Sequence, residues 1–384
     1  MLKLQTLLQS MPFEKAKEIL SLPPYSFKVQ ENDHYVLFAY NQIETDMSLP
    51  EAIEARGIIF EKNADFTPVC VPFFKFWNYG ESKASVLDHS SLSIYEKVDG
   101  SLIKIWWSNI YDKWVISTNN TLDAYTAGLG DNPHFNNFGE LVEDILKQKG
   151  IINFETDANF SKGNTYMFEL TSIYNKVVIR HVKSDLTFLG YRDNSTLQEF
   201  EPYDIYLNNE IVLNKVKKYP LMSIDDILKA CEIMHGEQEG FVLVDKNFNR
   251  VKVKSPFYVT LHHAKDNGQF TSEKAIRIIQ INEVDEFLTY FPEFKPFFDE
   301  IIVLVDDYVS DMAQCLCIVL DGVEFLSRKD IALQLKSHKA AWYGFMVLDK
   351  ILKHEVYQMP RDCFEKMDSS RAAKFIGEKS IKVA

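Results

Sequence analysis

The stretch Ser93-Ile-Tyr-Glu-Lys-Val-Asp-Gly-Ser-Leu-Ile103 decides how the rest of the chain is interpreted. Its pattern predicts a strand, a tight turn at Asp99-Gly100, and a second strand over residues 102–107. Lys97 then lies at a strand end, where the chain bends and a substrate could come close. A surface hairpin with a solvated lysine fits the same pattern, because Lys-x-Asp-Gly arises by chance in roughly one chain in ten of this length. The motif therefore needs support from other parts of the chain.

Composition limits the classes of function. The chain has 384 residues, 46% hydrophobic and 25% charged, and its formal net charge is −13. The length indicates two or three domains, and the negative charge excludes a generally basic nucleic-acid-binding surface, so an RNA site must be a local patch. Five scattered cysteines indicate reduced thiols in a cytoplasmic protein rather than a disulfide framework. Acidic residues interrupt the most apolar run, 301–320, so no membrane span is expected.

The order of predicted elements indicates two domains. Strands are expected at residues 35–40, 57–60, 69–71, 102–107, 114–118, 166–171, 176–181, 186–191, 240–244 and 250–254, with helices at 138–149 and after a cap at Ser223. Without regular βαβ alternation, this pattern predicts an antiparallel-rich α+β domain over residues 1–264. Helical periodicity at 272–282, 295–320, 328–339 and 344–354 predicts an all-helical domain over residues 265–384.

Charged residues interrupt several apolar strands or aromatic runs. They are Arg56, Lys75, Lys97, Glu169, Glu239, Lys252 and Lys254. Each alone is typical of a solvated strand face, but the apolar neighbours of Glu169 predict a buried strand, where a charge is paired or functional. Together, four cations match a triphosphate, two carboxylates suit a divalent metal and a ribose hydroxyl, and one lysine at a turn can act as a nucleophile. The chain has no glycine-rich phosphate loop, so cationic side chains must bind the phosphates.

The order of these residues resembles that of the covalent nucleotidyltransferases, the ATP-dependent ligases and GTP-dependent capping enzymes, whose first motif is Lys-x-Asp-Gly. The pattern is most similar to the phage type 1 RNA ligases of tRNA repair. The similar segments are residues 54–60, 75–78, 96–102, 168–169, 186–192, 239–242, 251–255 and 257–262. The resemblance covers most of the chain. It implies an ATP-grasp-like nucleotidyltransferase domain followed by a helical RNA-binding domain.

The resemblance also implies a three-step reaction that forms a phosphodiester bond. Lys97 attacks the α-phosphorus of ATP, the resulting lysyl-AMP passes AMP to an RNA 5′-phosphate, and an RNA 3′-hydroxyl displaces AMP. By the same resemblance, Arg56 and Lys75 orient the β- and γ-phosphates, and Lys252 and Lys254 stabilise charge on the α-phosphate. Glu169 contacts the ribose or a metal ion, and Glu239 binds Mg²⁺ or Mn²⁺. Val242 packs on adenine, and the backbone carbonyl of Glu96 recognises its amino group. The implied partner is RNA, above all a tRNA broken between a 5′-phosphate and a 3′-hydroxyl. The protein is expected to be a monomer. It is expected in the cytoplasm, which is the host's cytoplasm if a phage encodes the protein.

Two positions depart from this pattern or leave it open. Asn119 stands where the relatives carry a basic residue, and both Phe188 and Tyr191 are candidates for stacking on adenine. The alternatives are a DNA ligase, a capping guanylyltransferase, or a non-catalytic RNA-binding relative. The first two usually append a β-barrel module, against which the helical periodicity after residue 272 speaks. The intact Lys97 argues against the third.

Overall fold

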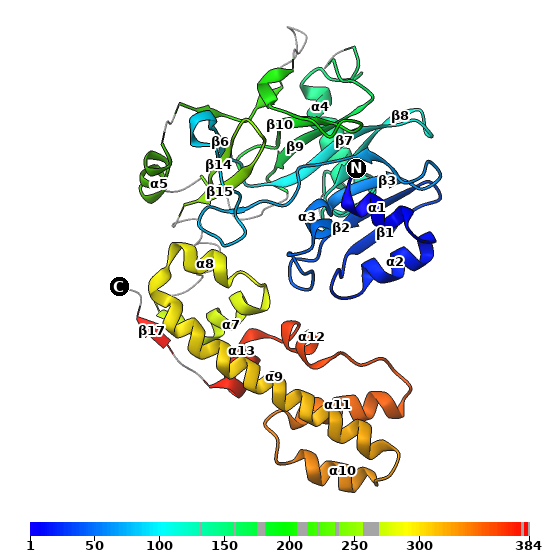
Figure 1. Cartoon of the computed structure of the whole chain (residues 1–384), viewed down its shortest axis with the longest axis vertical. Helices are drawn as coiled ribbons and strands as arrows, with labels where there is room; N and C mark the ends of the chain where they lie inside the picture. Colours follow the sequence, from blue (N-terminus) through cyan, green and yellow to red (C-terminus); the bar gives the residue numbers. More distant parts are fainter. Residues whose placement is uncertain are drawn as a thin grey trace. The chain divides into compact units, whose positions relative to one another are not determined.

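The computed structural model describes residues 1–130, 133–156, 159–174, 181–205, 213–220, 223–234, 238–255, 269–377 and 380–382. The chain divides into two compact units, Met1–Tyr258 and Val259–Ala384 (Figure 1). The first unit combines antiparallel sheets with helices, which confirms the mixed class predicted from the sequence. Nearly all of the strand predicted at 176–181 and the whole segment 257–262 lie outside the described residues.

The first sheet, sheet A, is antiparallel with the order β1-β2-β3-β4. Its strands are β1 (Lys28–Glu31), β2 (Tyr35–Ala39), β3 (Arg56–Glu61) and β4 (Thr67–Cys70), and its helices are α1 (Lys3–Gln9), α2 (Phe13–Ser21) and α3 (Pro50–Glu54). The carboxylate of Glu54 accepts hydrogen bonds from the backbone N–H groups of Lys3 at 2.9 Å and Leu4 at 2.8 Å. These bonds satisfy free N–H groups at the start of α1 and hold the end of α3, directly before Arg56.

Sheet B has the order β13-β6-β14-β15-β5. Its strands are β5 (Trp77–Asn78), β6 (Ser93–Lys97), β13 (Lys218–Tyr219), β14 (Gly240–Val244) and β15 (Arg250–Lys254). One face buries Ile94, Phe241 and Leu243 with residues of α5 (Ile224–Glu232). As predicted, the Ser223 side chain caps this helix by accepting from the N–H of Asp226. Because side chains alternate along a strand, Lys97 of β6 and the cationic side chains of β15 lie on the face opposite α5.

Sheet C has the order β11-β10-β9-β7-β8, and β12 pairs with β10. Its strands are β7 (Ser101–Ser108), β8 (Lys113–Thr118), β9 (Asn164–Thr171), β10 (Asp185–Asp193), β11 (Glu199–Phe200) and β12 (Asn214–Lys215). The helix α4 (Phe138–Gln148) packs on one face, where Ile103, Phe168 and Phe188 lie in register. The neighbouring row, Leu102, Glu169 and Thr187, therefore points to the opposite face. The described part of unit 1 also has three short 3₁₀ turns: η1 (His89–Ser91), η2 (Ala124–Thr126) and η3 (Pro202–Asp204).

The turn at Asp99-Gly100 does not form the hairpin expected from the sequence. β6 pairs with β13 and β14, whereas β7 pairs with β8 and β9, so the chain crosses from sheet B to sheet C here. A Cβ atom at Gly100 would collide with the backbone carbonyl of Leu170 in β9. The glycine therefore allows a close approach between the crossover and sheet C, which brings the end of β6 beside Glu169.

Unit 2 is mainly helical. Its helices are α7 (Ser272–Gln280), α8 (Val284–Tyr290), η4 (Pro292–Phe294), α9 (Lys295–Val323), α10 (Arg328–Leu335), α11 (Ala341–Leu352), α12 (Pro360–Glu365) and α13 (Ser369–Ile376). The long helix α9 buries Tyr308, Met312 and Cys315 in the unit's core, together with Tyr343 of α11. None of the described helices has an apolar stretch long enough to cross a membrane.

The prediction of an all-helical second domain is wrong in one respect. β16 (Gln269–Thr271) pairs antiparallel with β17 (Ser380–Lys382), which joins the two ends of the described part of the unit in a small sheet. Strands of three residues are too short for alternation to be recognised, and their pairing joins segments more than a hundred residues apart.

Candidate active site

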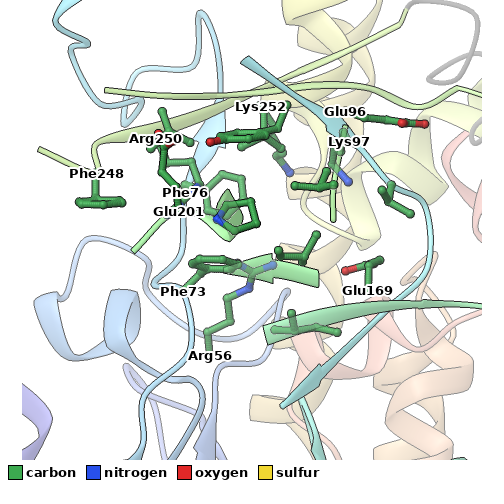
Figure 2. A pocket seen from close by; sticks show the side chains of 18 of the residues that line it. Arg56, Phe73, Phe76, Glu96, Lys97, Glu169, Glu201, Phe248, Arg250 and Lys252 are labelled. Carbon is green, nitrogen blue, oxygen red and sulfur yellow. The ribbon is translucent and has the colours of Figure 1, made fainter. Parts of the chain in front are cut away.

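Two adjoining cavities lie in unit 1, and side chains from all three sheets line them. The first cavity is lined by predicted site residues Arg56, Lys75, Glu96, Lys97, Glu169, Val242 and Lys252, among others. The second is lined by Arg56, Lys97, Asp99, Asn119, Glu169 and Glu239, among others. Lys97 and Glu169 thus lie at the junction of both cavities. Figure 2 shows Lys97 and Lys252 on one side of the first cavity, facing Arg56 and Glu169 on the other.

Lys97 forms an ion pair with Glu239. Its Nζ donates a hydrogen bond of 2.5 Å to Oε2 of Glu239, whose side chain is only 4% exposed. The pairing of β6 with β14 places Lys97 opposite Gly240, so the preceding Glu239 reaches the end of β6. The ion pair occupies both side chains in the protein without substrate, so a substrate or a metal ion that binds either one must displace its partner.

Glu169 lies in β9, and its environment disfavours the charged carboxylate. Burial is the largest cause and raises its pKa to about 7, with a further upward contribution from Glu239. The cations Lys97 and Arg56 act in the opposite direction. The prediction that Glu169 lies in a buried strand is confirmed, since both of its neighbours in β9 are fully buried.

Arg56 and Lys75 approach the first cavity from sheet A and the segment that follows it. The guanidinium of Arg56 lies 5.1 Å from the centroid of the Phe76 ring, and its buried Nη1 has no hydrogen-bond partner among the described residues. Lys75 Nζ lies 5.0 Å from the centroid of the Tyr40 ring. A buried guanidinium nitrogen without a partner is costly, so this corner of the cavity is suited to an anion.

The register of sheet B aligns the remaining predicted residues. Tyr95, Val242 and Lys252 form one row across β6, β14 and β15, and Lys97, Gly240 and Lys254 form the next. Facing residues in an antiparallel pair share a face, so Lys252 and Lys254 lie on the same face as Lys97. Lys254 is not among the residues that line the two cavities, although its row leads to them.

The comparison with protein families identifies this chain. A model of a family described as RNA ligase matches residues 54–258, which include every predicted site residue. The chain belongs to the RNA ligase family. The resemblance to the phage type 1 ATP-dependent RNA ligases is therefore confirmed at the level of the family.

The chain aligns with only part of the length of two individual relatives. It is 30% identical over 280 residues to a putative bifunctional polynucleotide kinase/RNA ligase of Autographa californica nuclear polyhedrosis virus, covering 69% of this chain and 38% of the viral protein. It is 28% identical over 256 residues to a putative RNA ligase of Thermovibrio ammonificans, covering 62% and 60%. The chain thus matches less than two thirds of the length of either relative.

Solved RNA ligase structures are more distant. An archaeal ATP-dependent RNA ligase superposes with a TM-score of 0.45 at 12% identity, over 80% of this chain and 82% of the other. A variant RNA ligase of Naegleria gruberi with ATP and Mn superposes with a TM-score of 0.33 at 14% identity, over 45% and 51%.

Neither of the two candidates for stacking on adenine, Phe188 and Tyr191, lines either of the two cavities. Phe188 is fully buried under α4, and Tyr191 stacks on Tyr166 and Phe200. A bulge between Phe188 and Gly190 shifts the alternation of β10 and leaves Leu189 at the first cavity. The aromatic residues that line that cavity are Tyr40, Phe73, Phe76, Tyr95, Phe200 and Phe248.

The side chain of Glu96 does not take part in the cavity as a carboxylate. Its strand partner is Phe241, which is buried with α5, and Figure 2 shows the carboxylate pointing away from Lys97 and Lys252. The resemblance implies a role only for the backbone carbonyl of Glu96, so the direction of the side chain does not test that prediction.

Asn119 lines the second cavity, and a buried cation that the sequence analysis did not single out lies nearby. Lys104 of β7 is fully buried, and its Nζ donates a hydrogen bond to the carbonyl of Gly57. A Cβ atom at Gly57, whose φ is +77°, would collide with both Lys104 Nζ and the carbonyl of Asn119. Burial lowers the pKa of Lys104 to about 8. Lys104 could have been found from the sequence, because it is a charged residue within an apolar strand, as Glu169 is.

The second cavity offers oxygen ligands that fit a divalent cation. Glu169 and Glu239 contribute carboxylates, and the buried Oδ1 of Asn119 has no hydrogen-bond partner among the described residues. Hard ions such as Mg²⁺ and Mn²⁺ prefer such oxygen donors.

Arg250 also lines the first cavity and was not predicted. It lies two residues before Lys252 in β15, so extending the alternation of Lys252 and Lys254 by one step would have found it.

Proposed function

We propose that this RNA ligase uses ATP to join RNA 5′-phosphate and 3′-hydroxyl ends through a lysyl-AMP at Lys97. The observation that carries the proposal is the position of the Lys97 amine. It lies where the two cavities meet, paired with Glu239 and facing Arg56 and Glu169. A nucleotide in the first cavity would therefore present its α-phosphate to an amine that also borders the second.

In the first step the amine must lose a proton before it attacks. Glu239 Oε2, at 2.5 Å, is placed to accept the proton from Nζ. The nitrogen lone pair then forms a bond to the α-phosphorus, the bond to the β-phosphate oxygen breaks, and pyrophosphate leaves. Arg56 and Lys75 bind the departing phosphates, and Lys252 and Lys254 neutralise charge on the α-phosphate in the transition state.

The two later steps reuse the same groups. An oxygen of the RNA 5′-phosphate attacks the phosphorus of the lysyl-AMP, and the N–P bond breaks as Nζ takes up a proton. The RNA 3′-hydroxyl then attacks the activated 5′-phosphate, and AMP leaves. A divalent cation held by Glu169, Glu239 and Asn119 would supply positive charge at the reacting phosphates.

The apolar part of the first cavity accounts for nucleotide binding. Val242 and Leu189 line it together with the aromatic residues, which suits a purine base. Adenine packs on Val242 in this proposal, and the backbone carbonyl of Glu96 accepts from its amino group. The domain over residues 1–264 carries out nucleotidyl transfer. The domain over residues 265–384 binds RNA, with a broken tRNA as the proposed substrate and a cytoplasmic monomer as the proposed form.

Labelling with nucleotide tests this function. Incubation with α-labelled ATP and Mg²⁺ should give a protein–AMP adduct, and Lys97→Ala should give none. Equal labelling of the variant would refute Lys97 as the nucleophile. Replacing ATP by GTP in the same assay separates a ligase from a capping enzyme, and circularisation of a 5′-phosphorylated RNA tests the complete reaction.

A further inference from the structure

A third cavity adjoins the first and has no role in the reaction described so far. We call it the aromatic groove, and its volume is about 840 Å³, against about 170 Å³ for the first cavity. The side chains that matter to the argument are Phe74, Phe76, Trp77, Lys83, Phe248 and Arg250. Three of these, Phe76, Phe248 and Arg250, also line the first cavity, so they separate the two spaces.

Partly exposed aromatic rings line the groove. Phe74 comes from the segment after sheet A, Trp77 from β5 of sheet B, and Phe248 from the turn between β14 and β15. Phe248 has a φ of +59°, which is rare for a bulky side chain. The carboxylate of Asp245 holds this turn by accepting from the N–H groups of Asn247 and Asn249, both at 2.9 Å. The protein therefore holds the Phe248 ring in place between the groove and the first cavity.

Cations accompany these rings. Arg250 lies 4.3 Å from the centroid of the Phe73 ring and donates to Glu199 at 2.6 Å. Arg192, which is 4% exposed, also binds Glu199, and its buried Nε has no hydrogen-bond partner among the described residues. With Lys75 and Lys83, the described residues that line the groove include four cations and one carboxylate, that of Glu199. In a chain with a net charge of −13, this is a local positive patch.

We propose that the aromatic groove binds the single-stranded RNA that carries the 5′-phosphate. Aromatic rings interleaved with cations suit a single strand, because bases stack on the rings and phosphates pair with the cations. This inference rests on the proposed function and assigns its RNA donor a subsite.

The chemistry of the second step gives the strand its direction. Once AMP is transferred, the RNA 5′-phosphate occupies the place of the ATP β-phosphate, next to Arg56 and Lys75. Lys75 lines both the first cavity and the groove, so the nucleotides attached to that phosphate lead from one into the other. Trp77 and Phe74 then stack on bases, and Lys83 contacts the backbone.

Two variants in the groove test this subsite in the full-length protein. The readout is the apparent KM for a 5′-phosphorylated, single-stranded oligoadenylate during AMP transfer. Loss of one stacking contact in Trp77→Ala should raise it roughly 5- to 100-fold, whereas Trp77→Phe should restore most of the affinity. Lys83→Glu should also raise it and should change its salt dependence. A matched charge reversal outside the groove, Lys147→Glu in α4, where the lysine side chain is 67% exposed, should leave it unchanged.

Separate measurements keep the outcomes distinct. Adduct formation with α-labelled ATP tests the proposed function, and fluorescence anisotropy with the same oligonucleotide tests the groove even if no adduct forms. An unchanged KM and unchanged affinity in both Trp77→Ala and Lys83→Glu would overturn the inference. The inference would also be overturned if the variants transferred AMP to RNA normally but pyrophosphate reversed their adduct formation less effectively. That result would make the groove a pyrophosphate site. Thermal melting checks the fold, and the surface variant Lys83→Glu decides the outcome if Trp77→Ala does not fold.

Discussion

The Nζ of Lys97 lies 2.5 Å from Oε2 of Glu239, so the proposed nucleophile and a proposed metal ligand are joined in the protein without substrate. Each has a second proposed partner, the α-phosphorus for Lys97 and a divalent cation for Glu239. Binding of either substrate or metal ion must therefore loosen this pair, and the release of the amine is coupled to occupation of the site.

Removing the charge of Glu239 should slow formation of the lysyl-AMP. Glu239→Gln keeps the size of the side chain but removes the proton acceptor, so the single-turnover rate of adduct formation should fall by about 100-fold or more. The measurement is rapid-quench labelling with ATP at a fixed metal concentration. Glu143→Gln in α4, where the carboxylate is exposed, serves as the control. A rate within about twofold of the unaltered protein would contradict the role of Glu239.

Arg56 should determine affinity for the triphosphate. Its Nη1 is buried without a partner in the described part of the protein, so a bound phosphate would satisfy it. Arg56→Ala should raise the KM for ATP in adduct formation by about tenfold or more, and Arg56→Lys should rescue little, because a lysine lacks the planar fork. Arg328→Ala in unit 2, where the side chain is 72% exposed, is the matched control. An unaltered KM in Arg56→Ala would show that the phosphates bind elsewhere.

Glu169 should make the folded protein less stable as pH rises. Its pKa is raised to about 7 from an ordinary value of 4.5, so between these values the folded state holds a proton that the unfolded state has lost. The stability contributed by this proton is complete below pH 4.5 and is lost as pH rises through about 7. Glu169→Gln should remove that dependence and raise the free energy of unfolding above pH 7 by about 1 to 2 kcal/mol. Urea unfolding without nucleotide or metal, between pH 4.5 and 8, gives the measurement. Parallel pH curves for the two proteins would contradict the assignment.

Lys104 should have the opposite effect at alkaline pH. Burial lowers its pKa to about 8 from an ordinary 10.5, so the folded state loses this proton before the unfolded state does. The free energy of unfolding should gain a contribution on the order of 2 kcal/mol as pH rises from about 8 to 10.5. Lys104→Met should lack this gain, and the difference between the two curves isolates it from other titrating groups. A difference that does not vary with pH would mean that Lys104 remains charged when buried.

The sequence was sufficient to identify the family and to name candidate residues, several of which the structure brings to two adjoining cavities. The Lys-x-Asp-Gly motif, the order of charged residues from Arg56 to Lys254, and the family are all properties of the linear chain. Strand and helix positions followed from alternation and periodicity, since these depend on neighbours a few residues apart. The helix after Ser223 and the buried strand around Glu169 are examples.

Only the tertiary structure decided which strands pair and which side chains meet. It turned the expected hairpin at Asp99-Gly100 into a crossover between two sheets, and it placed Glu239 on Lys97. It also buried Phe188 under α4, where a bulge in β10 broke the simple alternation. Local patterns specify which face of a strand a residue occupies, but not what that face packs against. Pairing between distant segments depends on the packing of the whole unit, and no short stretch of sequence contains that information.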